Sequence, residues 1–173
     1  IKTYVSKAKV YLGGISDQLR GSKTSLMASI GMSEDCGEPL EDKAYTEYQS
    51  IGYEQQSFAT KPGIFGWDKI DQGSCLLIEQ LPAVLSSLKS EPEVVVDLGC
   101  GYGFLTVMAS QRMEGHFIST DNNVAAVAAC EKNIIRCKIN GEAILDDCAA
   151  SINTKADMVL CNPPFHQGFD VDG

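Results

Sequence analysis

The stretch VVVDLGCGYG, residues 94–103, constrains the fold more than any other part of the chain. An unbroken run of three valines, with no polar alternation, is typical of a strand buried on both faces of a parallel sheet. Gly99, Gly101 and Gly103 then follow at every second position. Glycine lets the backbone turn sharply, expose amides at a helix start and approach a ligand without a Cβ in the way. These ten residues therefore predict a strand, a ligand-facing loop and a helix in succession.

Strand and helix patterns alternate around this loop. Asp71 can cap a helix over residues 72–89, interrupted near Pro82. After the strand VVVDLG, the later segments predict in order a helix FLTVMASQRM, a strand HFISTDN, a helix VAAVAACEKNIIRCK, a strand EAILDD and, after a short irregular crossover, a strand DMVLCN. Such alternation predicts an α/β fold with a doubly wound parallel sheet and right-handed crossovers.

The first sixty residues have a different character. Residues 1–12 place apolar side chains at helical spacing among lysines, which predicts a basic amphipathic helix. A short strand is expected around SLMASI, an acidic loop over residues 33–44, and an extended stretch leading up to Pro62. These segments are typical of pieces of a domain, so we expect residues 1–60 and residues 61–173 to belong to different domains.

Composition restricts the environment and the partners. The sequence has no export signal and no run of 18 apolar residues, and its seven cysteines form no CxxC pair. We therefore expect reduced cysteines and a cytoplasmic protein. A net charge of −9 argues weakly against non-specific nucleic-acid binding. No Cys/His spacing indicates a metal site.

The glycine loop and the strand ends indicate the kind of ligand. The G-x-G-x-G spacing departs from the G-x-G-x-x-G that cradles a dinucleotide pyrophosphate, so a nucleoside without phosphates fits better. Asp121 ends the second strand, where a carboxylate can accept from a ribose diol or, alternatively, cap the next helix. Asp147, or its neighbour Asp146, ends the third strand, where it can meet an adenine amine or form a solvated turn. Carboxyl ends of parallel strands share one edge of the sheet, so these groups should lie together.

The fourth strand runs into Asn-Pro-Pro-Phe at residues 162–165. Two successive prolines remove two backbone donors and fix φ twice, so the segment must leave the sheet as a rigid arm. Such an arm can be a stop signal, or it can present Asn162 and Phe165 to a substrate.

Taken together, DLGCGYG, TDNN, LDDC and CNPPFH make residues 61–173 resemble the class I S-adenosylmethionine-dependent methyltransferases. Within them the chain is most similar to the bacterial ribosomal RNA guanine N2-methyltransferases, notably the C-type enzymes that act on small-subunit RNA. The resemblance implies S-adenosylmethionine as cofactor, ribosomal RNA or the small ribosomal subunit as partner, and a monomeric enzyme. It assigns catalysis to Asn162, Pro163, Pro164 and Phe165. It assigns cofactor binding to Asp97, Gly99, Gly101, Gly103, Asp121, Asn122, Asp147 and Asn162.

The resemblance also implies that the sequence is a piece of a longer enzyme. The sheet of this superfamily has seven strands, of which residues 93–161 supply the first four. A related, cofactor-free N-terminal domain precedes the catalytic one in this family, and residues 1–60 would be its tail. Four other functions stay open: a large-subunit RNA guanine N2-methyltransferase, a protein glutamine N5-methyltransferase, an adenine N6-methyltransferase and a non-catalytic S-adenosylmethionine-binding module.

Overall fold

The computed structural model of the chain describes residues 8–12, 15–20, 26–30 and 45–163. The chain divides into two compact units, Ile1–Lys43 and Ala44–Gly173. The first unit holds helical residues 8–12 and an antiparallel hairpin of β1 (Ile15–Arg20) and β2 (Leu26–Ile30). The expected strand around SLMASI is thus confirmed, whereas residues 1–7 of the expected helix and the acidic loop at 33–44 lie outside the described residues.

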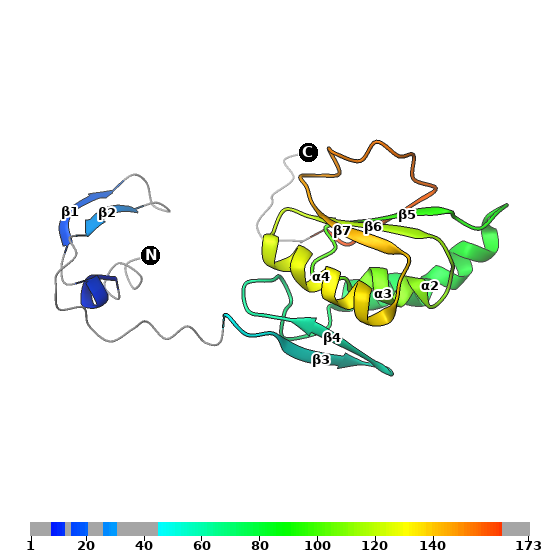
Figure 1. Cartoon of the computed structure of the whole chain (residues 1–173), viewed down its shortest axis with the longest axis horizontal. Helices are drawn as coiled ribbons and strands as arrows, with labels where there is room; N and C mark the ends of the chain where they lie inside the picture. The colour runs from blue at the N-terminus through cyan, green and yellow to red at the C-terminus, as the bar shows by residue number, and fades with distance from the viewer. Residues whose placement is uncertain (1–7, 13–14, 21–25, 31–44, 164–173) are drawn as a thin grey trace, which may run out of the picture. The chain divides into compact units, whose positions relative to one another are not determined.

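Over residues 45–163, the second unit contains a two-stranded hairpin, three helices and a four-stranded sheet (Figure 1). Its elements are β3 (Gln49–Tyr53), β4 (Gln56–Thr60), α2 (Gln72–Ser87), β5 (Val94–Leu98), α3 (Phe104–Ser110), β6 (His116–Asp121), α4 (Val124–Cys137), β7 (Gly141–Leu145) and β8 (Met158–Cys161). The β3–β4 hairpin belongs to this unit, so the unit begins before residue 61. That the first sixty residues derive from a separate domain stays a prediction.

The four-stranded sheet confirms the expected fold class. Its strand order is β7-β6-β5-β8, and every neighbouring pair is parallel. In register, Leu98 of β5 pairs with Thr120 of β6 and with Cys161 of β8, so these three strands end level with one another. The order reverses at β5, because β6 and β7 lie on one side of it and β8 on the other. Open α/β sheets bind ligands beside such a reversal, at the carboxyl ends of the strands.

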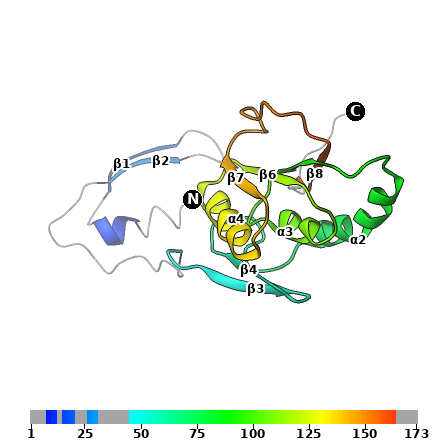
Figure 2. The same cartoon turned by 45° about the vertical axis from the view of Figure 1, so that its right-hand side comes forward.

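The helices and the last crossover lie on opposite faces of the sheet. In Figures 1 and 2, α2, α3 and α4 all cover one face, and the connection from β7 to β8 passes over the other. A right-handed crossover that returns across β5 must change face, which explains this arrangement. The connection, residues 146–157, is irregular, as the sequence predicts. Within residues 45–163, therefore, helices cover only one face of the sheet.

The β3–β4 hairpin packs beneath the glycine loop and α3. Phe58 of β4 is fully buried, and its ring centroid lies 5.9 Å from that of Tyr102 and 5.4 Å from that of Phe104. Tyr53 of β3 meets Phe104 edge-on at 5.1 Å. Aromatic pairs at these separations contribute about 0.5–1.5 kcal/mol each beyond the area that they bury. The hairpin therefore supports the loop from below.

The buried amide of Asn133 joins this hairpin to α4. The Asn133 side chain accepts from the Ala59 backbone N–H at 2.8 Å and donates to the Ala59 carbonyl at 3.0 Å. It also donates to the carbonyl of Tyr102 at 2.7 Å, in the glycine loop. Asn133 thus bonds β4 as a neighbouring strand would, and it connects the hairpin, the helix and the loop.

Two helix predictions need correction. Helix α2 continues unbroken through Pro82 and ends at Ser87, where we expected an interruption and an end near residue 89. A proline removes one helical hydrogen bond, but Ile78 and Leu81 on the same helix are buried in the core and hold the backbone in place. Helix α3 ends at Ser110 rather than 113, because the N–H groups of Arg112 and Met113 both turn back to the carbonyl of Ala109.

None of the helices among the described residues is long and apolar enough to cross a membrane. Six cysteines fall in the described part of the chain and all are free thiols; four are buried or half-buried, while Cys148 and Cys161 are exposed. Cys36 lies outside the described residues.

Candidate active site

A cavity lies where the strand order reverses, at the carboxyl ends of β5 and β8. It brings together the glycine loop, the segment before α2, and the residue that follows β8. Its lining residues are Phe65, Gly66, Asp71, Ser74, Gly99, Cys100, Gly101, Tyr102, Phe104, Leu105 and Asn162. The sequence predicts this edge as the ligand site, and the cavity lies at it.

The glycine loop is held open toward this cavity by backbone bonds to β6. The N–H groups of Gly99 and Cys100 both donate to the carbonyl of Thr120, at 2.8 and 2.9 Å. Gly99 and Gly101 have φ of 75° and 56°, in the left-handed region that favours glycine. A Cβ built on either would meet no atom within 4 Å, so both face open space. This is the geometry expected of a loop that a ligand approaches closely.

Gly103 plays a different part from the other two glycines. It is the N-cap of α3 with φ of 87°, and a Cβ there would lie 2.7 Å from the Sγ of Cys130 on α4. The positive φ favours glycine, and the close approach of Cys130 leaves no room for a Cβ. The structure therefore places Gly103 on the side of the loop away from the open space that Gly99 and Gly101 face.

Asp97 lies buried at the end of β5 and does not line the cavity. Its Oδ2 accepts from the Thr106 hydroxyl at 2.6 Å and from the Thr106 backbone N–H at 3.1 Å, which ties β5 to α3. Its Oδ1 is equally buried and has no hydrogen-bond partner. Burial raises the pKa of this carboxyl to about 6, against the lowering effect of the Thr106 bonds.

Asp121, at the end of β6, fixes the glycine loop. Its Oδ2 accepts from the N–H of Gly101 at 2.9 Å, and its Oδ1 accepts from the N–H of Asn123 at 2.8 Å. The helix cap is Asn123, whose side chain accepts from the N–H of Ala125, so the alternative interpretation of Asp121 as the cap is wrong. Asn122 is exposed beside them.

The third strand end contributes a turn. Asp146 accepts from the backbone N–H of Asp147 at 2.8 Å and from that of Ser151 at 3.1 Å, which closes the start of the β7–β8 connection. Asp147 is exposed and does not belong to the cavity lining. Of the two carboxylates, the structure gives Asp146 a local structural role and leaves Asp147 in solvent.

Asn162, directly after β8, reaches across the cavity to the start of α2. Its Nδ2 donates to Asp71 Oδ2 at 2.7 Å and to Ser74 Oγ at 2.8 Å. Pro163 follows and is exposed. The remaining residues of the predicted arm, Pro164, Phe165 and His166, lie outside the described residues.

The charge of the cavity suits a cationic ligand. Among its lining residues Asp71 is acidic and none is basic. Asp97 and Asp121 lie behind the glycine loop, and the Oδ1 of Asp97 still lacks a partner. Anionic phosphates would be repelled here, whereas S-adenosylmethionine carries a sulfonium and an ammonium group. The residues present therefore fit this cofactor.

Sequence reasoning missed two side chains of this site. Asp71 was expected as a helix cap, which it is, since its Oδ2 accepts from the N–H of Ser74 at 2.9 Å. Its bond to Asn162, 91 residues away, had no signal in the sequence. Ser74 was not singled out, although a serine three residues after a capping residue can direct its hydroxyl toward the partner that the capping side chain contacts.

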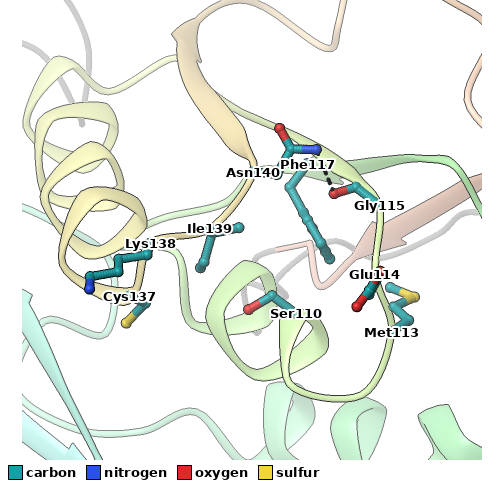
Figure 3. A pocket seen from close by; sticks show the side chains of 9 residues that line it. All are labelled: Ser110, Met113, Glu114, Gly115, Phe117, Cys137, Lys138, Ile139 and Asn140. Atoms are coloured by element: carbon teal, nitrogen blue, oxygen red, sulfur yellow. Dashed lines mark hydrogen bonds between the residues drawn. The ribbon is translucent and has the colours of Figure 1, made fainter.

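A second hollow lies at the opposite edge, at the amino ends of β6 and β7 (Figure 3). Asn140 spans part of it by donating to the carbonyl of Gly115 at 3.2 Å. The glycine loop and Asn162 do not line it. Among the described residues no group of three His, Cys, Asp or Glu side chains could hold a metal ion.

The chain is similar in sequence to two kinds of ribosomal RNA methyltransferase. The chain is 32% identical over 169 residues to a ribosomal RNA large subunit methyltransferase G of Shewanella putrefaciens, covering 91% of the chain and 40% of that protein. It is 32% identical over 112 residues to a ribosomal RNA small subunit methyltransferase C of Pseudoalteromonas translucida, covering 64% of the chain and 31% of that protein. The chain thus spans less than half of the length of these relatives.

A solved structure supports the same assignment. A T. thermophilus 16S rRNA N2 methyltransferase in complex with AdoMet and guanosine superposes with a TM-score of 0.76 at 25% identity, covering 96% of this chain and 45% of that one. The model of the methyltransferase small domain family matches residues 55–173. With a parallel sheet that reverses at β5, a glycine loop and an asparagine after β8, the chain belongs to the methyltransferase small domain family.

Proposed function

We propose that the chain is part of an S-adenosylmethionine-dependent methyltransferase that modifies the exocyclic N2 amine of a guanine in ribosomal RNA, with small-subunit 16S RNA as the expected substrate. Family membership, the two kinds of ribosomal RNA methyltransferase among its relatives and the structural likeness to a 16S N2 enzyme support this proposal. Ribosomal RNA or the small subunit would be the partner, and the cytoplasm the location. We expect the intact enzyme to be a monomer.

The observation that carries the proposal is the placement of Asn162 beside the glycine-loop cavity. An amino group on guanine has its lone pair delocalised into the ring, so it is a poor nucleophile. Hydrogen-bond acceptors that hold its two hydrogens out of the plane of the ring turn the lone pair away from the π-system and make it available for attack. Asn162 Oδ1 and the backbone carbonyl of Pro163 would be those acceptors, and the proline arm would orient them.

The other assigned residues would bind the two substrates. S-adenosylmethionine supplies an electrophilic methyl group, so the reaction needs no strong base, and the methylated amine loses its proton afterwards. Gly99 and Gly101 would let the cofactor approach the backbone closely. Asp121 would hold the loop through its bond to Gly101, and Asp97 would tie β5 to α3 through Thr106. Phe165 would stack on the flipped-out base, a contact worth about 1–3 kcal/mol.

A second candidate substrate is a guanine of large-subunit RNA. The alignment with the Shewanella methyltransferase G covers 91% of the chain, against 64% for the Pseudoalteromonas methyltransferase C, at the same identity. Both candidates use the same chemistry at the same atom. The amine of a glutamine side chain or of adenine would be held by the same two groups, Asn162 Oδ1 and the Pro163 carbonyl. The assay must therefore include protein and DNA substrates.

Methyl transfer from tritiated S-adenosylmethionine to unmodified small subunits, unmodified large subunits, release factor and DNA would identify the acceptor. Nucleoside analysis of the labelled RNA should find N2-methylguanosine. We expect the label on the small subunit; label on the large subunit alone would shift the assignment to the second candidate. Label on release factor or DNA, with none on either subunit, would refute the RNA proposal.

A further inference from the structure

The side-chain amide of Asn162 has both of its hydrogens occupied within the protein. Its Nδ2 donates to Asp71 Oδ2 at 2.7 Å and to Ser74 Oγ at 2.8 Å. A primary amide has two N–H donors, so these two bonds use its full donor capacity. What remains for a substrate is Oδ1, an acceptor.

The Asp71 carboxylate decides which way this amide faces. An amide oxygen and nitrogen have nearly the same shape, so an asparagine can rotate by 180° unless its partners distinguish them. The N–H of Ser74 holds the pKa of Asp71 below its usual range, and the Asn162 amide is a further cause, while partial burial acts in the opposite direction. An ionised carboxylate only accepts, so rotating Asn162 would place two oxygens against each other at 2.7 Å.

The start of α2 is shaped around this bond. Asp71 Oδ2 accepts both from Asn162 and from the N–H of Ser74, so the helix cap and the amide share one oxygen atom. Gly73 lies between them. A Cβ built there would be 3.0 Å from Asn162 Oδ1 and 3.0 Å from Asp71 Oδ2, closer than side chains ordinarily pack. The backbone of Gly73 does not have a positive φ, so the space beside Asn162, and not the backbone conformation, explains the glycine.

We propose that Asp71, Ser74 and Gly73 form a positioning element that fixes Asn162 with Oδ1 toward the substrate amine. Asp71 and Ser74 take the two hydrogens of the amide, and Gly73 leaves the room that this rotamer needs. This inference deepens the proposed function and rests on the role of Asn162 in it. In this inference the element acts on the substrate amine only through Asn162, so its residues are positioning residues.

Three variants of the intact protein separate positioning from helix stability. Asp71→Ser keeps a side chain that caps helices well but removes the carboxylate that reaches Asn162. Gly73→Ala improves intrinsic helix propensity but crowds Asn162. Gln72→Ala, at the exposed residue between them, is the matched control.

For Asp71→Ser and Gly73→Ala we expect kcat for RNA methylation to fall about 10- to 100-fold, the loss typical of a misplaced group. KM for RNA and the melting temperature should stay near those of Gln72→Ala in both variants. KM for S-adenosylmethionine should stay so in Gly73→Ala, which leaves the charge of the cavity intact, and should rise in Asp71→Ser, which removes an acidic lining residue. Asp71→Asn keeps an acceptor oxygen and should retain more kcat than Asp71→Ser. Unchanged kcat in both principal variants would overturn the proposal, and so would a loss of kcat that follows a loss of stability.

A measurement without turnover keeps this inference separate from the assignment of the substrate. In protein labelled with ¹⁵N, the side-chain amide hydrogens of Asn162 should exchange with solvent about tenfold faster in Asp71→Ser than in Gln72→Ala, because a charge-assisted bond is lost. Equal exchange rates would refute the positioning element even if the enzyme methylates RNA. Faster exchange in an enzyme that methylates a different acceptor would preserve the element and refute the proposed substrate.

Discussion

Replacing Asp97 by asparagine tests the electrostatics at the base of the glycine loop. The carboxyl is fully buried, and desolvation raises its pKa from 3.8 to about 6. In the unfolded chain it should return to its ordinary value, so the folded protein binds the proton more tightly. Stability from this group is therefore complete below about pH 4 and is lost as the pH rises through 6.

The size of the effect follows from the shift. About two pKa units correspond to about 3 kcal/mol of unfolding free energy, lost between about pH 4 and 7. Asp97→Asn removes the ionisation and keeps an oxygen that can accept from Thr106. We expect the unfolding free energy of the variant to change less with pH over this range than that of the unchanged protein. Relative to their values at pH 4, the unchanged protein should lose about 3 kcal/mol more than the variant by pH 7.

Two measurements check this reasoning. A ¹³C titration of the side-chain carboxyls should show one resonance with a midpoint near pH 6 that is absent in Asp97→Asn. Thermal unfolding at a series of pH values should show the difference in slope, and Asp68→Asn, at an exposed position, should keep the slope of the unchanged protein. A midpoint below about 4.5, or equal slopes in Asp97→Asn and the unchanged protein, would refute the account.

Three further substitutions test the rest of the site. Asn133→Ala should destabilise the second unit by about 2–4 kcal/mol, because it removes the hydrogen-bond partners of Ala59 and Tyr102. Hydrogen exchange in β4 should also accelerate. A loss of stability as small as that of the exposed Asn140→Ala would contradict this. Gly103→Ala should cost about 2–4 kcal/mol in denaturant unfolding because of its φ and its contact with Cys130. The double variant with Cys130→Ala should then lose less than the sum of the two single losses, and strict additivity would argue against the contact. Asn162→Ala should abolish methyl transfer while the Kd for S-adenosylhomocysteine stays within about threefold, as expected when the main role of the group is to hold the methyl acceptor; unchanged turnover would exclude its role.

Local sequence determined the order and type of the elements in the second unit. The valine run, the glycine loop and the helical periodicities act within a few residues of one another, so strands and helices from 72 to 161 could be predicted with their approximate ends. Errors occurred where longer contacts outweigh local preference. Helix α2 passes through Pro82 because Ile78 and Leu81 are buried, a condition that no local pattern records.

The tertiary structure decided what each site residue does. Three glycines at equal spacing look alike in sequence, yet Gly99 and Gly101 face open space while Gly103 packs against Cys130. The resemblance assigns cofactor binding to both Asp97 and Asp147, yet one is buried under the loop and the other is in solvent. Which way a side chain faces depends on the neighbouring elements, and these are far away in the chain.

The amide of Asn162 shows this division most directly. Sequence alone left open whether the proline arm ends the strand or presents Asn162 to a substrate, and the resemblance implies the second. Only the folded chain brings Asp71 within 2.7 Å of it across 91 residues and so determines which atom of the amide is free. A hydrogen bond requires two groups to meet in space, and their separation along the chain carries no record of that meeting.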